Sequence, residues 1–319
     1  MSPGGAAGPD GLAVIDKEPG WTSHDVVAKA RGVFGTRKVG HAGTLDPDAT
    51  GVLLLGVGRA TKLLRFVTPL PKHYVGELVL GTETTTLDAS GEVTAVHDMA
   101  GVTPEQVADA AAGFVGPIMQ VPPMVSAVKV GGRRLHELAR QGIEVDREAR
   151  PVTVHRLDVA PVDATVGIYR LDVECSSGTY IRSLAADIGA ALGGGGHLRA
   201  LRRRGIGSFT EAEAHPIGAF AGPRDDSGGS SSGAEAGSIT MPKLLSMAEA
   251  LRDYPAVAVD EPLARRVSQG QVLATRELGV EGTGPWAVVG PQGLLLAVYQ
   301  AHAPDRVKPA VVIPLSSPR

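Results

Sequence analysis

The stretch that decides the fold of this chain reads Gly40-His41-Ala42-Gly43-Thr44-Leu45-Asp46-Pro47-Asp48-Ala49-Thr50-Gly51. It is rich in small residues, and a proline follows its first aspartate. Because proline disfavours helical dihedrals in the residue before it, Asp46 is expected to present its carboxylate from an extended or turn backbone. A second interpretation is that Asp46 caps a short helix beginning at Pro47. The segment alone leaves both interpretations open.

The same segment fits a different chemistry. Asp46-x-Asp48-x-Thr50 matches the nucleophile motif of magnesium-dependent aspartyl phosphatases of the haloacid dehalogenase type. That chemistry places the first aspartate at the end of a buried apolar strand. Residues 37–44 precede Asp46 here and do not have the composition of such a strand. The phosphatase is therefore the weaker alternative.

The composition indicates a folded globular protein. Of 319 residues, 43% are hydrophobic and 20% charged, and the length suits about two domains. The single cysteine, Cys175, excludes an internal disulfide framework and suits a reducing compartment. No apolar stretch reaches the ~18 residues of a membrane span, and residues 1–10 do not resemble a secretory signal. We expect a cytoplasmic protein without a membrane partner.

The basic residues form two acid-free stretches, although the net charge of −3 is not typical of a nucleic-acid binder. The first contains Lys29, Arg31, Arg37, Lys38 and His41, and the second contains His197, Arg199, Arg202, Arg203 and Arg204. Either stretch alone is more typical of a solvated surface than of a ligand site.

Hydrophobic periodicity and turn signals predict an α+β protein. We expect a helix capped by Ser23 and ended by Gly35, and a second helix from the Thr103 cap through Phe114. Strands are predicted at 12–15, 169–175, 287–289, 294–299 and 310–313, and a helix with Ile181, Leu184, Ala185 and Ile188 on one face.

A stretch rich in glycine and serine divides the chain. We expect a disordered N-terminus at 1–10, a large domain at 11–220, a flexible linker at 221–240 and a small β-rich module at 241–319. The histidines are scattered, and neither a cysteine pair nor a P-loop is present. We therefore expect no metal and no cofactor.

The segment 40–51 resembles the catalytic-aspartate motif of the TruB family, the bacterial tRNA pseudouridine-55 synthases. Further motifs resemble that family in the same order along the chain. They are Asp16-Lys17 with Gly20-Trp21-Thr22-Ser23, Lys72-His73-Tyr74, Asp88-Ala89-Ser90-Gly91, Gln120-Val121-Pro122-Pro123, Ser126-Ala127-Val128-Lys129, Arg147–Pro151, Cys175–Arg182 and Gly196–Arg203. Together they extend from Leu12 to about Phe209. The proline displaced to Pro19 and the histidine at His136 depart from the family pattern.

The resemblance implies a pseudouridine-synthase catalytic domain with a mixed, largely antiparallel central sheet flanked by helices. It also implies an RNA-gripping insertion at about 120–150 and a PUA-like C-terminal module. The implied reaction converts uridine 55 in the T-loop of tRNA to pseudouridine, after the nucleotide has been flipped into a pocket. The implied partner is the tRNA T-arm, and we expect a monomer.

The resemblance also assigns roles to individual residues. Asp46 is the implied nucleophile, and whether it attacks C1′, attacks the base or abstracts a sugar proton stays open. Arg182 would keep Asp46 charged, and Tyr74 would stack on the uracil and shuttle a proton. The implied substrate-binding residues are His41, Tyr74, Tyr180 and Leu201, and the RNA-binding residues are Lys17, Lys129, Arg133, Arg134, Arg199, Arg202 and Arg203. A non-catalytic RNA-binding or tRNA-folding protein on the same scaffold is the second alternative.

Overall fold

The computed structural model describes residues 8–126, 129–130, 133–134, 141, 143, 145–217 and 242–314, with 129–130 and 133–134 described by their backbone only. The predicted linker at 221–240 and part of the predicted insertion at 120–150 lie outside the described residues. Asp10, which we expected in a disordered N-terminus, accepts hydrogen bonds from Arg59 N at 2.5 Å and Nε at 2.7 Å. The chain is therefore anchored one residue before its first strand.

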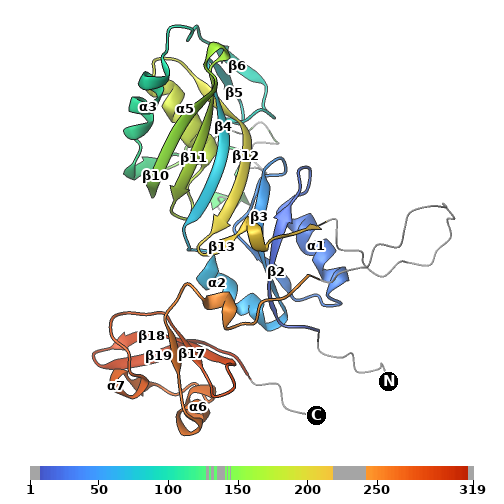
Figure 1. Ribbon diagram of the computed structural model, residues 1–319, viewed down its shortest axis with the longest axis vertical. Coiled ribbons are helices and arrows are strands. Elements are labelled where there is room, and N and C mark those ends of the chain that lie inside the picture. The colour runs from blue at the N-terminus through green and yellow to red at the C-terminus, as the bar shows by residue number, and fades with distance from the viewer. Residues whose placement is uncertain are drawn as a thin grey trace, which may run out of the picture.

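One mixed sheet of ten strands forms the larger part of the molecule (Figure 1). Its order is β14-β1-β3-β12-β4-β11-β10-β7, with β2 on β3 and β13 on β12. The strands are β1 (Gly11–Lys17), β2 (Val39–Ala42), β3 (Thr50–Val57), β4 (Lys72–Leu80), β7 (Gly116–Gln120), β10 (Arg150–Asp163), β11 (Ile168–Cys175), β12 (Gly196–Ile206), β13 (Phe209–Thr210) and β14 (His215–Pro216). Only the β1–β14 and β3–β12 pairings are parallel. The predicted α+β class with a mixed, largely antiparallel sheet is confirmed.

Two halves of this sheet meet where β3 lies beside β12. Only two residue pairs make the junction, Thr50 with Arg202 and Gly51 with Arg203. Gly51 has φ +99°, and a Cβ there would overlap the backbone carbonyl of Arg203. Because glycine alone combines that dihedral with so close an approach, Gly51 permits the junction.

Helix α1 (Ser23–Val33) covers one face of the first half of the sheet (Figure 1). The prediction that Ser23 caps this helix is wrong, because Thr22 is the N-cap and forms a capping box with Asp25. The Ser23 hydroxyl is instead buried, where it accepts from Leu45 N at 2.9 Å and donates to Leu45 O at 3.2 Å. The predicted cap residue thus holds the segment before Asp46.

Strand β3 is apolar along its length because both of its faces are covered. Leu53 and Leu55 pack with α1, whereas Val52 and Leu54 pack on the opposite face in a second core. That second core also contains residues of α2 (Leu64–Val67) and of the C-terminal sheet. Burial on both faces explains a continuous apolar run where a half-exposed strand would alternate.

Helices α3 (Pro104–Ala112) and α5 (Ile181–Ala191) pack against the second half of the sheet. The predicted capping box between Thr103 and Gln106 is confirmed, although α3 ends before Phe114. The predicted apolar face of α5 is buried in the core, as expected from its periodicity. Two hairpins extend from this half, β5 (Thr82–Thr84) with β6 (Val93–Val96) and β8 (Lys129–Val130) with β9 (Arg133–Arg134).

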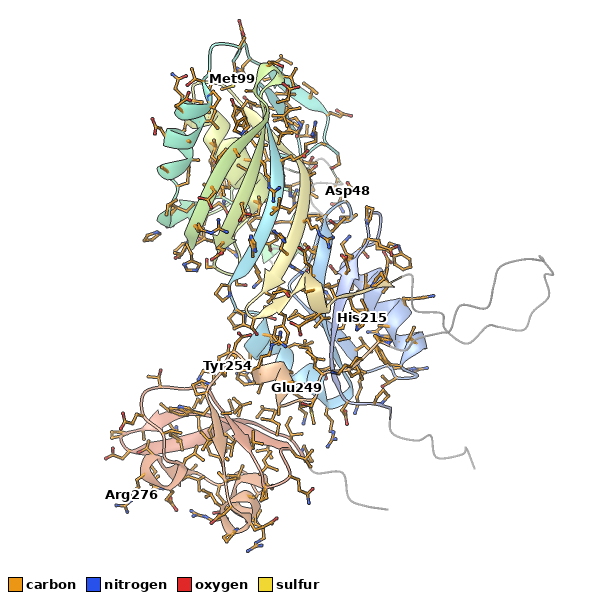
Figure 2. The ribbon with its side chains drawn as sticks, in the orientation of Figure 1. Asp48, Met99, His215, Glu249, Tyr254 and Arg276 are labelled. Carbon is orange, nitrogen blue, oxygen red and sulfur yellow. The ribbon has the colours of Figure 1, made fainter. Side chains whose placement is uncertain are left out.

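The C-terminal residues form a separate five-stranded sheet, in agreement with the predicted β-rich module. The strands of this sheet are β15 (Ala256–Ala258), β16 (Leu273–Ala274), β17 (Trp286–Val289), β18 (Leu295–Ala303) and β19 (Arg306–Val312). Two helices accompany them, α6 (Glu261–Ser268) and α7 (Thr275–Leu278). Tyr254 and Glu249 lie between the two sheets (Figure 2), and the Tyr254 hydroxyl donates to Phe66 O at 2.6 Å. Within the described residues, no helix is long and apolar enough to cross a membrane.

We predict that Gly51→Ala destabilises the protein by about 3 kcal/mol, because the new Cβ adds both backbone strain and overlap with β12. Gly116→Ala is the matched control, since Gly116 has a similar φ of +103° but no atom within 4 Å of the added Cβ. Its loss should be about 1 kcal/mol. Urea denaturation of the two variants measures the difference, and equal losses would contradict the proposed role of the junction.

Candidate active site

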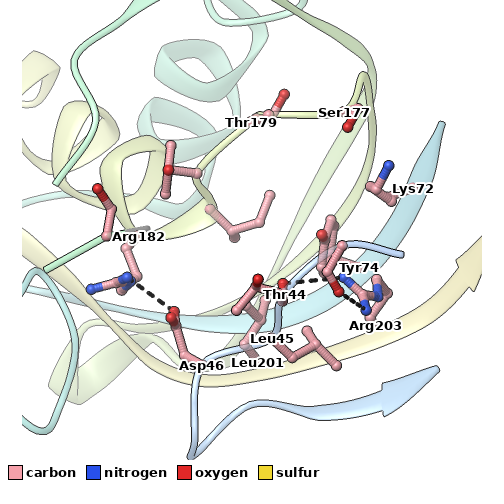
Figure 3. Close-up of a pocket in the computed structure, with 15 residues that line it drawn as sticks. Thr44, Leu45, Asp46, Lys72, Tyr74, Ser177, Thr179, Arg182, Leu201 and Arg203 are labelled. Carbon is pink, nitrogen blue, oxygen red and sulfur yellow. Dashed lines mark hydrogen bonds and ion pairs between the residues drawn. The ribbon is translucent and has the colours of Figure 1, made fainter. Parts of the chain in front are cut away.

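A cavity of about 260 Å³ opens at the junction between the two halves of the sheet (Figure 3). Its lining comes from the β2–β3 loop, β4, Ser126, the turn before α5 together with the first residues of α5, and β12. The residues are Gly43, Thr44, Leu45, Asp46, Lys72, Tyr74, Ser126, Ser177, Gly178, Thr179, Tyr180, Ile181, Arg182, Leu201 and Arg203. The volume lies just below the range of about 300–1,000 Å³ typical of small-molecule pockets, so one flat ring is a suitable occupant.

The loop that carries Asp46 is a turn with no helix in it. Ala49 N donates to Asp46 O at 3.2 Å, and Gly20 N donates to Pro47 O at 3.0 Å. The helix-cap interpretation of Asp46 is therefore wrong, and the turn expected from Pro47 is present. Since β2 ends at Ala42, no strand leads directly into Asp46, which removes the strand context that the phosphatase interpretation needs.

Lys17 is a structural clamp for this loop. It is completely buried, and its Nζ donates to Pro47 O at 2.8 Å, Trp21 O at 2.8 Å and Glu18 O at 3.0 Å. Burial lowers the pKa of Lys17 to about 8. The prediction that Lys17 contacts RNA does not fit this position, because all three of its protons are donated inside the protein.

Arg182 lies beside Asp46, as the sequence predicted. Its Nη2 is 3.0 Å from Asp46 Oδ2, and its side chain is only 5% exposed (Figure 3). The guanidinium also donates to Thr86 O at 3.0 Å and to Val125 O at 2.8 Å, and its Nη1 is 3.3 Å from Asp88 Oδ2. A buried arginine with acceptors on both edges has a fixed orientation, so it presents the same edge to Asp46 at all times.

Asp88 is a site residue to which the sequence analysis gave no role. It lies in a turn where Leu87 has φ +60°, a left-handed conformation that is strained for leucine. Bonds from Leu198 N to Leu87 O at 3.1 Å and from Ala89 N to Leu198 O at 3.0 Å hold this turn against β12. No local pattern showed that this turn faces Arg182, because the contact depends on the packing of distant segments.

The pKa of Asp46 is raised above its usual range. Partial enclosure by the cavity is the largest cause, and the nearby carboxylate of Asp88 adds to it, whereas the Arg182 charge opposes the shift. The side chain keeps 44% of its surface exposed, toward the cavities that it lines. Asp46 is therefore a carboxylate that is accessible from the cavity and held in place by its ion pair with Arg182.

Tyr74 and Arg203 are directly opposite each other on β4 and β12 and line the same cavity. Burial raises the pKa of Tyr74, and the Arg203 charge opposes this shift. Arg203 is 1% exposed and donates to Val52 O at 2.7 Å and Gly43 O at 3.0 Å. Arg203 thus lines the cavity with its guanidinium donors on protein carbonyls, which disfavours the predicted contact with RNA phosphates.

Tyr180 and Leu201 also line the cavity, as predicted. Gln120 fixes the backbone of Tyr180, because its amide accepts from Tyr180 N at 2.7 Å and donates to Tyr180 O at 3.0 Å. His41 is not among the lining residues. It lies on β2 with its ring edge-on to His24 at 5.4 Å, and burial lowers its pKa.

The other predicted RNA-binding residues differ in their surroundings and in whether the structure describes their side chains. Arg199 pairs with Glu77 at 2.5 Å, and Arg202 pairs with Asp16 and Glu211, both at 2.9 Å. The side chains of Lys129, Arg133 and Arg134 lie outside the described part of the structure. Within that part, no three His, Cys, Asp or Glu side chains gather closely enough to hold a metal ion.

Comparisons with known proteins agree on one family. Residues 31–181 match the model of the TruB family pseudouridylate synthase N-terminal domain, and residues 182–221 match that of the tRNA pseudouridylate synthase B C-terminal domain. A tRNA pseudouridine synthase B of Mycobacterium sp. (strain KMS) is 44% identical over 98% of both chains. That of Corynebacterium aurimucosum is 47% identical over 91% of this chain and 92% of its own.

A solved structure shares the fold as well. The chain superposes on one in the crystal structure of a Cbf5-Nop10-Gar1 complex with a TM-score of 0.70 and 26% identity. The match covers 95% of this chain and 85% of the other.

We predict that Asp88→Asn lowers the pKa of Asp46, because it removes a neighbouring negative charge and leaves Arg182 with one carboxylate to neutralise. Asp48→Asn is the control and should shift the pKa in the same direction by less, since Asp48 is the weakest of the contributors. Carboxyl ¹³C NMR titration measures the value, with the resonance assigned by its loss in Asp46→Asn. An unchanged or raised pKa in Asp88→Asn would contradict this electrostatic picture.

Proposed function

The chain belongs to the TruB family of pseudouridylate synthases, and from this premise we propose that it isomerises uridine 55 in the T-loop of tRNA with Asp46 as the nucleophile. The observation that carries the proposal is the Asp46–Arg182 pair at 3.0 Å on the wall of a cavity that also contains Tyr74 and Tyr180. The family membership supplies the reaction, and the cavity supplies the groups that the reaction needs.

The reaction moves one bond without changing the composition of the nucleotide. The C1′–N1 bond breaks, the uracil turns, a C1′–C5 bond forms, the proton on C5 leaves, and the freed N1 takes up a proton. A stacked base is inaccessible to a side chain, so the nucleotide must first leave its stack at a cost of a few kcal/mol. The walls formed by Tyr74, Tyr180 and Leu201 offer the extruded base apolar and aromatic contacts that offset this cost.

In this proposal Asp46 acts as an ionised carboxylate. A carboxylate can form a covalent intermediate that divides one difficult step into two easier ones. Arg182 favours the charged form, and its other contacts prevent it from following the substrate. Attack on C1′, attack on the base and abstraction of a sugar proton are all open to a carboxylate in this position.

Tyr74 is the proposed stacking and proton-transfer group. Its raised pKa keeps the hydroxyl protonated at neutral pH, so the side chain enters the reaction as a neutral donor. The adjacent Arg203 charge makes loss of that proton easier than burial alone would allow. Tyr74 is thus suited to give a proton and to recover it within one turnover.

Arg199 and Arg202 remain candidates for RNA contact. Each already pairs with a carboxylate near the surface, and such pairs are typically worth ~0–1 kcal/mol, so a phosphate can replace the carboxylate. Their contribution to the salt dependence of binding should be smaller than that of an unpaired cation, because the displaced carboxylate must recruit a counterion.

A single assay with unmodified tRNA in EDTA distinguishes the proposed synthase from the two alternative functions. Isomerisation without added metal supports the synthase, binding without product supports a non-catalytic RNA-binding protein, and inactivity restored by magnesium supports the phosphatase. The presence of Asp46, Tyr74 and Arg182 around one cavity favours catalysis. An RNA-folding role on the same scaffold is compatible with it.

Asp46→Asn should reduce isomerisation by at least about a thousandfold while the Kd for tRNA stays nearly unchanged. The amide keeps the shape of the side chain but is neither a nucleophile nor a base. Release of tritium from tRNA labelled at C5 of uridine measures turnover, and a filter assay measures binding. Turnover at the rate of the unaltered enzyme would exclude Asp46 as the nucleophile.

The position of the target is tested with T-arm hairpins. A hairpin with cytidine at position 55 should give no pseudouridine even when its other loop uridines are kept, whereas the unaltered hairpin should be converted. Chemical mapping of pseudouridine at each position provides the measurement. Product at another loop uridine would contradict the assignment to uridine 55 and leave the synthase activity intact.

A further inference from the structure

A second cavity of about 420 Å³ lies next to the catalytic one and shares part of its wall. Both are lined by Ser177, Gly178 and Tyr180, the residues that precede α5. The second cavity is completed by Gln120, Pro122, Arg150, Pro151 and Val152. A chain that leaves the catalytic cavity over this turn would enter the second one directly.

Arg150 is the cation of this second cavity. It is exposed, and in the described part of the chain no carboxylate pairs with it. It lies opposite Gln120 in the pairing of β10 with β7, and cross-strand partners project from the same face of a sheet. Gln120 binds the backbone of Tyr180, so Arg150 stands on the side of the sheet from which Tyr180 is held.

Arg150 differs from Arg182, Arg199, Arg202 and Arg203 in the partners of its guanidinium. Arg182 and Arg203 are buried and donate to protein acceptors, whereas Arg199 and Arg202 have carboxylate partners. An unpaired guanidinium at the surface can take a phosphate in a bidentate arrangement without first breaking an ion pair.

The rest of the second cavity suits a nucleotide. Pro122, Pro151 and Val152 provide an apolar wall, and Tyr180 provides an aromatic ring. Gly178 has φ +93°, and a Cβ at this position would meet no atom within 4 Å, so the backbone of the turn is open to close approach. A cation beside apolar and aromatic surface is the combination by which proteins hold single-stranded RNA.

We propose that the second cavity binds the nucleotide adjacent to the target uridine, with Arg150 on a phosphate that flanks the target. This inference rests on the proposed function, because it takes the occupant of the catalytic cavity to be a flipped uridine. Anchoring the neighbouring phosphate would hold the strand while the detached base turns, since the ribose then stays fixed by its backbone.

The test compares Arg150→Ala with Arg170→Ala, measuring binding of a T-arm hairpin over a range of salt concentrations. Arg170 is also exposed and unpaired within the described residues, but it lies near the opposite end of β11 from the catalytic cavity. Arg150→Ala should weaken binding about tenfold and reduce the slope of log Kd against log salt by about 0.7–1. Arg170→Ala should change neither, and Arg150→Lys should keep most of the slope.

Hairpins with one methylphosphonate identify the phosphate. Neutralising the phosphate that Arg150 holds should weaken binding to the unaltered enzyme about tenfold and have almost no further effect on Arg150→Ala. Additive losses at both flanking phosphates, or an equal slope change in Arg170→Ala, would overturn the proposal. Formation of pseudouridine by the unaltered enzyme in the same hairpin shows that such a failure concerns Arg150 and leaves the proposed function standing.

Discussion

The contact between Gly51 and the backbone of Arg203 is the constraint on which the rest of this molecule depends. The two halves of the central sheet share only two residue pairs at this point, and the groups of the candidate site are divided between the halves. Asp46 comes from the first half, and Tyr74 and Arg182 come from the second. The spacing between the carboxylate and its partner is therefore set by how closely β3 approaches β12. A side chain at position 51 would therefore alter that spacing although every catalytic group would be chemically unchanged.

Electrostatics at the site follows from one guanidinium shared by two carboxylates. Arg182 has little exposed surface and is held by two backbone carbonyls, so it cannot rotate toward Asp46 or toward Asp88 alone. Asp88 consequently has two effects with opposite consequences for Asp46. It fixes the position of the cation, which favours the ion pair, and its charge raises the pKa of Asp46, which disfavours ionisation. The orientation of Arg182 and the charge beside Asp46 both depend on the position of Asp88, which is set by the strained turn at Leu87.

Local signals in the sequence predicted much of this structure. The capping box at Thr103, the apolar face of α5 and the C-terminal strands were foreseen because each depends on residues close together in the chain. The resemblance added Asp46, Tyr74 and Arg182, which the structure brings to one cavity. Asp88 and the clamp formed by Lys17 were missed because each acts across a long separation in sequence. The structure disfavours the assignment of Lys17 and Arg203 to RNA for a related reason, since a cation count does not distinguish an exposed side chain from one whose donors are used inside the protein.

The distinction between exposed cations and cations whose donors are used inside the protein explains how a chain with net charge −3 can act on a polyanion. Binding to phosphates gains most from cations that release the counterions of the nucleic acid without exposing a carboxylate. The acid-free stretch around Arg202 looks favourable in sequence, yet the fold brings Asp16 and Glu77 to it from other strands and Glu211 from the turn after β13. Those carboxylates reduce the local positive potential and, with it, attraction for RNA of any sequence. Under the proposal made for Arg150, a cation without a carboxylate partner at the edge of the cavities would decide where a strand is held, so that affinity would be concentrated where the reaction takes place.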